Sequence, residues 1–296
     1  MPYAKAKDGC MLYYKDWGQG DPVVLLHGWP LSADTWDDAA IKLVEAGHRC
    51  VFPDRRGFGR SDQPWNGHDY DTYADDVAAV LEDAGINEPV TLVGFSMGGG
   101  EVARFLTKQG KVRVKKAVLI SSVVPYMLKT DDNPNGVPQS TFDQMTQGMK
   151  TDRADFFQSF FKDFFGVGIV SHPVSDGVLM NAWRQAMMAG LRPTLAAAKA
   201  FATTDFRPDL KSFDGVPTLC IHGTADVTVP IDASGREVAR QVPGARLIEY
   251  DGSAHGLFAT DKERLCEDLI AFLGGDDARI DAEASQSEVR TEEPAY

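Results

Sequence analysis

The stretch Val90-Thr-Leu-Val-Gly-Phe-Ser-Met-Gly-Gly-Gly100 decides the fold. An apolar run of strand length turns here, within a few residues, into a helical pattern that begins at Met97. Residues 94–98 match the pattern G-x-S-x-G, in which a sharp strand-to-helix turn holds the serine in a strained conformation. The turn exposes the serine hydroxyl at the carboxyl edge of a sheet, where a helix N-terminus favours negative charge. We therefore predict that Ser96 is a nucleophile, against the alternative of a glycine-rich turn with an incidental serine.

Short apolar runs alternate with helical patterns on both sides of this turn. The predicted strands are residues 23–26, 50–53, 90–94, 114–120, 218–221 and 245–250. The predicted helices of the same region are residues 34–46, 72–84, 97–109, 232–241 and 261–273. A β-hairpin precedes them, because Asp8-Gly9 supplies the positive φ of a tight turn between two short strands. This order predicts the α/β class, with a mainly parallel eight-stranded sheet and helices on both faces.

The alternation is interrupted between residues 122 and 213. Four helical patterns follow one another there, at residues 139–150, 152–165, 176–190 and 194–202. We expect a helical cap over residues 122–213, inserted between two parts of one core, residues 1–121 and 214–274. Residues 275–296 are expected to form a disordered acidic tail, since seven acids and two arginines from residue 276 onward accompany very few large apolar residues.

The composition argues against several classes of protein. The chain has 30 basic and 43 acidic residues, and the net charge of −13 would repel nucleic acid. Its apolar runs never exceed five residues, which is too short for a membrane span, and its first residues are polar, so a cytoplasmic location is expected. The cysteines are dispersed as expected for reduced, buried thiols: Cys10, Cys50, Cys220 and Cys266.

A nucleophilic serine needs a histidine base and an acid that orients the base. His255 follows the last predicted strand and comes last in the chain, as the order serine, acid, histidine of this motif requires. His222, at the end of the preceding strand, is the alternative base. The expected acid is Asp226, on the loop after His222, with Asp251 and Asp232 as alternatives.

The oxyanion formed by serine attack needs two hydrogen-bond donors. The backbone N–H of Met97 is one candidate, because it follows the nucleophile at the start of the helix. The other is the N–H of Trp29, in the loop after the first long parallel strand. Gly28 permits close approach there and Pro30 restricts Trp29 to extended angles, although a plain Gly/Pro turn would have the same sequence.

Cap and loop aromatic residues are candidates for the substrate pocket. Six phenylalanines between residues 156 and 165 form an apolar helix stripe, of which we expect Phe160 and Phe164 to reach the pocket together with Trp29 and Trp183. No cofactor is expected, because residues 57–62 begin like G-x-G-x-x-G but end in Asp62, and no phosphate-binding loop is present. No histidine pair has the spacing of a metal site, so no metal ligand is predicted (metal: none).

Several stretches together resemble one known family. They are YYKDWG (13–18), HGWP (27–30), DRRGFGRS (54–61), YADD (73–76), GFSMGGGEVAR (94–104), NPNGVP (133–138) and VPID (229–232). In these motifs the chain is similar to the cofactor-free bacterial haloperoxidases, α/β-hydrolases that also act as arylesterases and perhydrolases. The resemblance covers nearly all of residues 3–273, leaving the acidic tail outside. It implies the triad Ser96, Asp226 and His255, with the backbone amides of Trp29 and Met97 as the oxyanion hole.

The expected function is that of a serine esterase acting on small aryl or short-chain carboxylic esters through an acyl-enzyme. The resemblance adds promiscuous perhydrolase and haloperoxidase activity with hydrogen peroxide and a carboxylic acid. Dehalogenases and epoxide hydrolases of this fold are disfavoured, since they use a carboxylate nucleophile. A lactonase, a C–C bond hydrolase and a catalytically inactive binding protein of the same fold are the alternatives. The expected partner is a small-molecule ester or carboxylic acid, without nucleic acid or membrane, and a homo-oligomer is left open.

Overall fold

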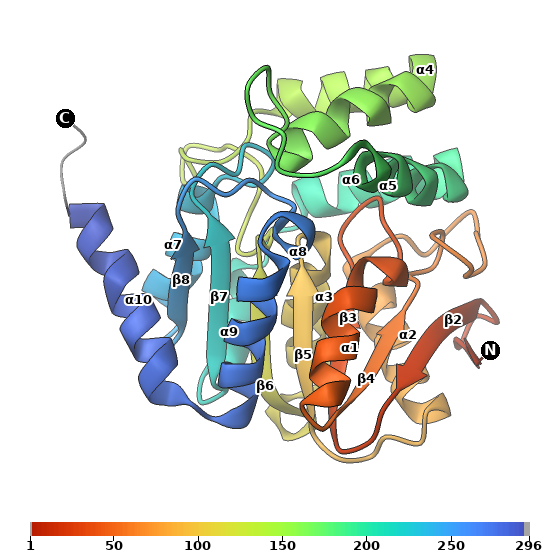
Figure 1. Cartoon of the computed structure of the whole chain (residues 1–296). Helices are drawn as coiled ribbons and strands as arrows, with labels where there is room; N and C mark the ends of the chain where they lie inside the picture. The colour runs from red at the N-terminus through yellow and green to blue at the C-terminus, as the bar shows by residue number, and fades with distance from the viewer. Residues whose placement is uncertain (1, 293–296) are drawn as a thin grey trace.

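Eight strands form a single sheet in the computed structural model, which describes residues 2–292. The strand order across the sheet is β1-β2-β4-β3-β5-β6-β7-β8 (Figure 1). The strands are β1 (Tyr3–Lys5), β2 (Met11–Trp17), β3 (Asp21–Leu26), β4 (His48–Pro53), β5 (Val90–Phe95), β6 (Val114–Ile120), β7 (Thr218–Gly223) and β8 (Arg246–Tyr250). The two pairings that involve β2 are antiparallel and all others are parallel. The prediction of a mainly parallel eight-stranded sheet opened by a hairpin is therefore confirmed.

Ten α-helices surround the sheet in the described part of the chain. They are α1 (Asp37–Glu45), α2 (Tyr70–Asp83), α3 (Met97–Gln109), α4 (Gln139–Phe165), α5 (Asp176–Met188), α6 (Leu191–Thr203), α7 (Gly235–Gln241), α8 (Leu257–Thr260), α9 (Lys262–Gly274) and α10 (Asp277–Glu292). Helices α1 and α9 pack together on one face of the sheet, and α2 and α3 pack together on the other (Figure 1). None of the helices within residues 2–292 is long and apolar enough to cross a membrane.

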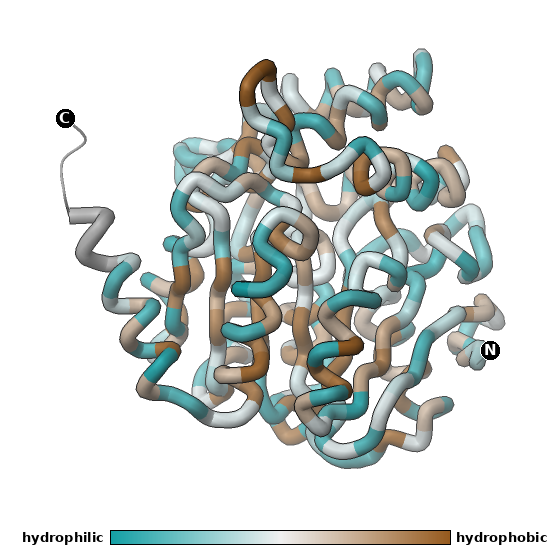
Figure 2. The backbone as a smooth tube through the Cα atoms, in the orientation of Figure 1, coloured by the Kyte–Doolittle hydropathy of each residue, from teal (hydrophilic) through white to brown (hydrophobic). Residues whose placement is uncertain are grey.

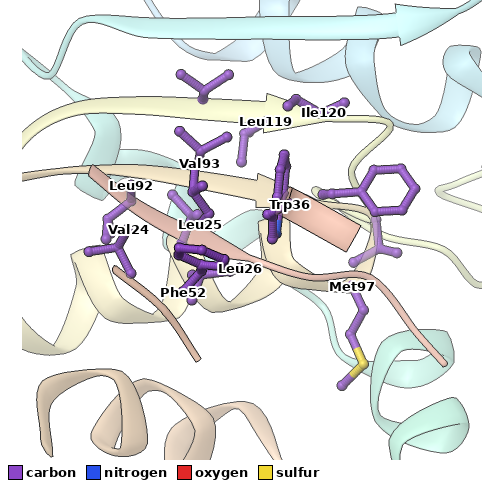
Figure 3. Packing of buried hydrophobic residues seen from close by; sticks show 14 of the residues in the cluster. Val24, Leu25, Leu26, Trp36, Phe52, Leu92, Val93, Met97, Leu119 and Ile120 are labelled. Atoms are coloured by element: carbon purple, nitrogen blue, oxygen red, sulfur yellow. The ribbon is translucent and has the colours of Figure 1, made fainter. Parts of the chain in front are cut away.

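The core lies between the central strands and these two helix layers. Side chains of β3, β5 and β6 belong to one cluster of almost completely buried residues, among them Val24, Leu92 and Leu119, and Figure 3 shows Val24 beside Leu92. Figure 2 shows the same pattern along the backbone, with hydrophobic residues concentrated in the central strands. Because these strands are covered on both faces, their buried parts are runs of consecutive apolar residues, such as Val23–Leu26 and Ala117–Ile120, rather than an alternation at every second residue.

Helices α4, α5 and α6 form a layer above the carboxyl edge of the parallel strands, at the top of Figure 1. Helix α4 has a kink at Asp152, whose backbone is non-helical and whose carboxylate accepts a hydrogen bond from the N–H of Asp155 at 3.0 Å. The kink corresponds to the predicted boundary between helical patterns ending at residue 150 and beginning at residue 152. The layer places the aromatic residues of α4 over the end of β5.

The acidic C-terminal segment differs from the predicted disordered tail, because residues 277–292 form helix α10. Ile280 of this helix is fully buried, and the Ser287 hydroxyl accepts a hydrogen bond from the backbone N–H of Glu249 on the edge strand β8 at 2.9 Å. Two carboxylates, Asp277 and Asp281, pair with Arg246 of β8. The helix therefore covers the free edge of the sheet; the remaining residues of the predicted tail, 293–296, lie outside the described residues.

Truncation after Gly275 is therefore expected to destabilise the protein. Burial of Ile280 is lost and the β8 edge is exposed, which corresponds to a drop in melting temperature of about 5 °C. Ser287→Ala should give a smaller drop, because the N–H of Glu249 loses its acceptor. The matched control is Ser285→Ala, an exposed serine of the same helix. Unchanged melting of the truncated chain, measured by calorimetry, would mean that α10 contributes nothing to stability.

Candidate active site

Ser96 lies at the turn between β5 and α3 with φ 53° and ψ −118°, a positive φ that non-glycine residues rarely adopt. Its backbone N–H donates to the carbonyl oxygen of Ile120 at 2.8 Å, which ties the turn to the neighbouring strand β6. Small residues on both sides allow the turn. A Cβ at Gly94 would lie 2.4 Å from the carbonyl oxygen of Gly98, and one at Gly98 would lie 2.3 Å from that of Leu26. The strained turn predicted from G-x-S-x-G is thus present.

His255 and Asp226 reach Ser96 from the loops after β8 and β7. The Nε2 atom of His255 is 2.9 Å from the Ser96 Oγ, and its Nδ1 is 2.6 Å from the Asp226 Oδ2. All three residues are less than a tenth exposed. The imidazole packs against the rings of Phe95 and Phe164, with ring centroids 5.0 and 4.7 Å away, and these two rings also contact each other at 6.0 Å. The structure therefore joins the three predicted side chains in one hydrogen-bonded chain.

The Asp226 carboxylate is fixed from several sides. Its Oδ1 accepts the backbone N–H groups of Thr228 and Val229 at 2.9 and 2.8 Å, while Oδ2 faces His255 and lies 3.3 Å from the Nε2 of His222. Burial would raise the pKa of Asp226, but the interactions with His255 and His222 outweigh it and hold that pKa well below its usual value. Asp226 is therefore an anion at neutral pH, placed to keep a proton on the Nδ1 of His255.

The alternative residues lie elsewhere. His222 is buried, and its Nε2 is 2.9 Å from the carbonyl oxygen of Val229. It therefore contacts the loop that carries Asp226 and makes no hydrogen bond to Ser96 among the described residues. Asp232 pairs with Arg236 at the surface, and Asp251 accepts a hydrogen bond from the Thr224 hydroxyl. Neither carboxylate contacts His255 in the described part of the chain.

Two backbone N–H groups are available beside Ser96. Met97 is the first residue of α3, so its N–H has no acceptor inside the helix. The N–H of Trp29 donates to no other group among the described residues. The loop that carries it passes directly over the serine, since a Cβ at Gly28 would lie 3.0 Å from the Ser96 Cβ. This arrangement is what two oxyanion donors require, and their role remains a prediction.

A cavity of about 290 Å³ lies between Ser96 and the cap helices. Most of its lining is apolar, and it includes the predicted residues Trp29 and Phe160. The cavity is also lined by residues that were not predicted, from the loop before α4, from α4 itself, from α6 and from the loop after β7: Val123, Val137, Thr141, Phe142, Met145, Phe156, Ser159, Asp163, Phe201, Val227, Thr228 and Val229. Their side chains converge only after the cap has folded over the sheet, so no local sequence pattern marks them.

Two of the predicted pocket residues do not line this cavity. The ring of Phe164 packs against the imidazole of His255 in a T-shaped arrangement, and Phe164 is not among the residues that line the cavity. The indole N–H of Trp183 donates to the carbonyl oxygen of Ala154 at 2.9 Å, which fastens α5 to α4. The prediction of Phe164 and Trp183 as pocket residues is therefore wrong, because it rested on helix periodicity without knowledge of how each helix is rotated.

Comparisons with known proteins place this geometry in a family. The alpha/beta hydrolase fold family matches residues 21–262. The chain is 44% identical over 275 residues to the non-heme chloroperoxidase CPO-A1 of Kitasatospora aureofaciens, covering 92% of this chain and 99% of that protein. It is also 44% identical over 276 residues to the bifunctional esterase/perhydrolase DCH of Acinetobacter calcoaceticus, with the same coverage.

Two solved structures have the same fold as this chain. The crystal structure of a bromoperoxidase from Bacillus anthracis matches with a TM-score of 0.88 and 42% identity, covering 92% of this chain and 99% of that one. An esterase from Exiguobacterium antarcticum matches with a TM-score of 0.86 and 30% identity, covering 92% and 98% of the two chains. The resemblance drawn from the sequence motifs is thereby confirmed. The chain is an enzyme of the α/β-hydrolase family, in the group that contains the non-heme haloperoxidases and the esterase/perhydrolase.

Proposed function

We propose that this enzyme is a serine esterase that hydrolyses small aryl or short-chain carboxylic esters through an acyl-enzyme on Ser96. The observation that carries the proposal is the hydrogen-bonded chain from Ser96 through His255 to Asp226 beside an apolar cavity. A serine hydroxyl within hydrogen-bond reach of a base, with the base oriented by a buried acid, is the arrangement used for acyl transfer.

In the first half of the proposed reaction, the Ser96 oxygen attacks the ester carbonyl carbon while the Nε2 of His255 accepts its proton. The N–H groups of Trp29 and Met97 stabilise the negative oxygen of the tetrahedral intermediate. The intermediate then collapses, and the leaving alcohol takes the proton from His255. Water repeats the sequence on the acyl-enzyme, so that the carboxylic acid leaves and the Ser96 hydroxyl is restored.

The cavity supports small substrates. Its volume of about 290 Å³ is at the lower end of ordinary ligand pockets, and aromatic residues such as Phe142, Phe156 and Phe160 form much of its wall. An aryl or short acyl group buries its apolar surface there. A long acyl chain would have to displace packed side chains, which is costly in a dense interior.

A series of p-nitrophenyl esters of increasing acyl length tests this proposal. We expect kcat/KM to be highest for short acyl groups and to fall about tenfold or more for the longest ones. Met145→Ala should shift the preference to longer chains, because Met145 lines the cavity. Met187→Ala is the matched control, since Met187 packs in the cap outside the cavity lining. A flat profile, or turnover of lactones without any turnover of these esters, would contradict the proposal.

Perhydrolysis is a second proposed activity, supported by the names of the relatives that combine esterase and perhydrolase or haloperoxidase function. A carboxylic acid would acylate Ser96 with loss of water, and hydrogen peroxide would then replace water as the attacking nucleophile. This step releases a peracid and restores the serine hydroxyl. The peracid, as the oxidant, then oxidises halide in solution, so the enzyme itself needs neither a redox centre nor a halide site.

A further inference from the structure

A buried ion pair lies behind the loop that carries Trp29. The guanidinium of Arg55 donates to both carboxylate oxygens of Glu101, at 2.6 and 2.7 Å, and both side chains are less than a twentieth exposed. Burying two charges costs desolvation free energy that their attraction often only offsets, so such a pair is weak evidence for a role in stability. Its position in the fold indicates a different role.

The pair connects the two elements that hold the candidate oxyanion donors. Glu101 is on α3, one turn after Met97. Arg55 follows β4 and donates from its Nη2 to the carbonyl oxygen of His27 at 2.6 Å. His27 precedes the Gly28-Trp29 peptide bond. One guanidinium group is therefore bonded both to the helix that presents the Met97 N–H and to the loop that presents the Trp29 N–H.

The side chain of His27 continues this connection. Its Nε2 is 3.0 Å from the backbone nitrogen of Arg55, an N–H group that can only donate, so Nε2 accepts and the ring proton is on Nδ1. Nδ1 donates to the carbonyl oxygen of Gly28 at 2.8 Å. Burial, followed by the charge of Arg55, lowers the pKa of His27 well below its usual value, so the ring stays neutral in this tautomer.

The bond to Gly28 determines the direction of the Trp29 N–H. In a trans peptide the C=O and the following N–H point in opposite directions, and the Gly28-Trp29 bond is trans. The Gly28 oxygen is held by the Nδ1 of His27 and by the backbone N–H of Leu31 at 3.0 Å. The Trp29 N–H is therefore directed away from both donors, and rotation of this peptide plane would break both hydrogen bonds.

We propose that His27 is a positioning residue that aims the Trp29 N–H at the oxyanion, and that the Arg55–Glu101 pair fixes this N–H relative to that of Met97. The proposal rests on the proposed esterase function of Ser96. None of these three side chains touches the substrate cavity, so they act through the backbone. Loss of one well-placed oxyanion donor typically lowers kcat by about 10²- to 10³-fold, which sets the upper limit for their effect.

Two substitutions of His27 separate its two hydrogen bonds. His27→Gln can still accept from the Arg55 N–H but loses the donor to the Gly28 oxygen. We expect its kcat for p-nitrophenyl acetate to fall about 10- to 100-fold with little change in KM. His27→Asn places an amide N–H near the former Nδ1 and should recover most of this loss. A purely structural role would not distinguish the two in this way.

The Arg55–Glu101 pair has a matched control in the same region. Arg56 and Asp76 form a second buried pair, with contacts of 2.5 and 2.6 Å, and it makes no hydrogen bond to the loop of residues 27–29 among the described residues. Glu101→Gln and Asp76→Asn each remove one carboxylate charge from a buried arginine, so both should lower the melting temperature. Only Glu101→Gln should also lower kcat.

Affinity for a boronic acid provides the decisive measurement, because its tetrahedral anionic adduct on Ser96 occupies the oxyanion site. Across His27→Gln, His27→Asn and Glu101→Gln we expect the loss of boronate affinity to parallel the loss of kcat. Equal kcat losses in Glu101→Gln and Asp76→Asn, or unchanged boronate affinity in His27→Gln, would overturn the proposal. Failure of the esterase function itself would look different, because the unmodified enzyme would then neither hydrolyse the ester nor react with a sulfonyl fluoride at Ser96.

Discussion

Ser96→Ala is expected to lower ester turnover by about 10³-fold or more, because the acyl-enzyme can no longer form. The same variant should lose peroxide-dependent halide oxidation, which in the proposed scheme passes through the same acyl group. In the unmodified enzyme that oxidation should require both hydrogen peroxide and a carboxylic acid such as acetate. Hydrolysis is measured with p-nitrophenyl acetate, and halide oxidation with a dye that is brominated in solution.

Ser121→Ala provides the matched control for this variant. Ser121 directly follows strand β6 and has a φ of 44°. It is fully buried, and its hydroxyl has no hydrogen-bond partner among the described residues. Both substitutions therefore remove a buried hydroxyl at a positive φ, but only one removes the group bonded to His255. Wild-type turnover in folded Ser96→Ala would refute the assignment. Halide oxidation that continues in this variant, or without any carboxylic acid, would refute the perhydrolase scheme.

The sheet and the grouping of Ser96, His255 and Asp226 could be predicted, because each depends on local patterns. The apolar run of β5, the small residues around Ser96 and the helix after it are contiguous, so the turn is readable from eleven residues. His255 and Asp226 lie in loops that follow predicted strands, and parallel strands bring their carboxyl ends to one edge. Chain order and strand direction were sufficient to bring these residues together.

The pocket could not be predicted in the same way. The phenylalanines of α4 form a stripe wide enough to face two directions, and periodicity does not say which side faces the substrate. Phe160 lines the cavity while Phe164, one turn later, packs on His255. That division depends on how α4 is rotated over the sheet, and rotation is set by tertiary contacts such as the bond from Trp183 to the carbonyl oxygen of Ala154.

Helix α10 was missed for a related reason. Its own sequence has low hydropathy and many like charges, which is typical of disorder. Its partners are distant in the chain: Arg246 binds Asp277 and Asp281, and Arg264 binds Glu283 at 2.9 Å. In the isolated segment the acidic residues would repel one another. In the folded protein their charges are paired with arginines of β8 and α9.

The Asp226→Asn variant is expected to lose activity by about 10³- to 10⁴-fold, although the side chain hardly changes in size. Oδ1 accepts the N–H groups of Thr228 and Val229, so asparagine can keep these bonds only with its oxygen on that side. Its NH₂ group then replaces Oδ2 and faces the Nδ1 of His255. An NH₂ group donates, so Nδ1 must accept, and the ring proton moves to Nε2.

With the proton on Nε2, His255 cannot accept the proton of Ser96, and the base is lost without any change in position. The opposite amide orientation is disfavoured, because it would place NH₂ against the two backbone N–H groups. Stability should also fall at neutral pH. The pKa of Asp226 is lower in the folded than in the unfolded chain, so its charge stabilises the fold at neutral pH, and this contribution is lost as the pH falls through the lowered folded-state pKa.

Measurement of kcat and melting temperature in parallel separates these two effects. Asp251→Asn is the control, because Asp251 is an exposed carboxylate on the loop before His255 and was the alternative acid in the sequence. It should keep both wild-type turnover and wild-type stability. If Asp226→Asn retained normal turnover while Asp251→Asn lost it, Asp251 would be the orienting acid. A loss confined to Asp226→Asn in folded protein would show that the tautomer of His255, held by one buried carboxylate, limits the reaction.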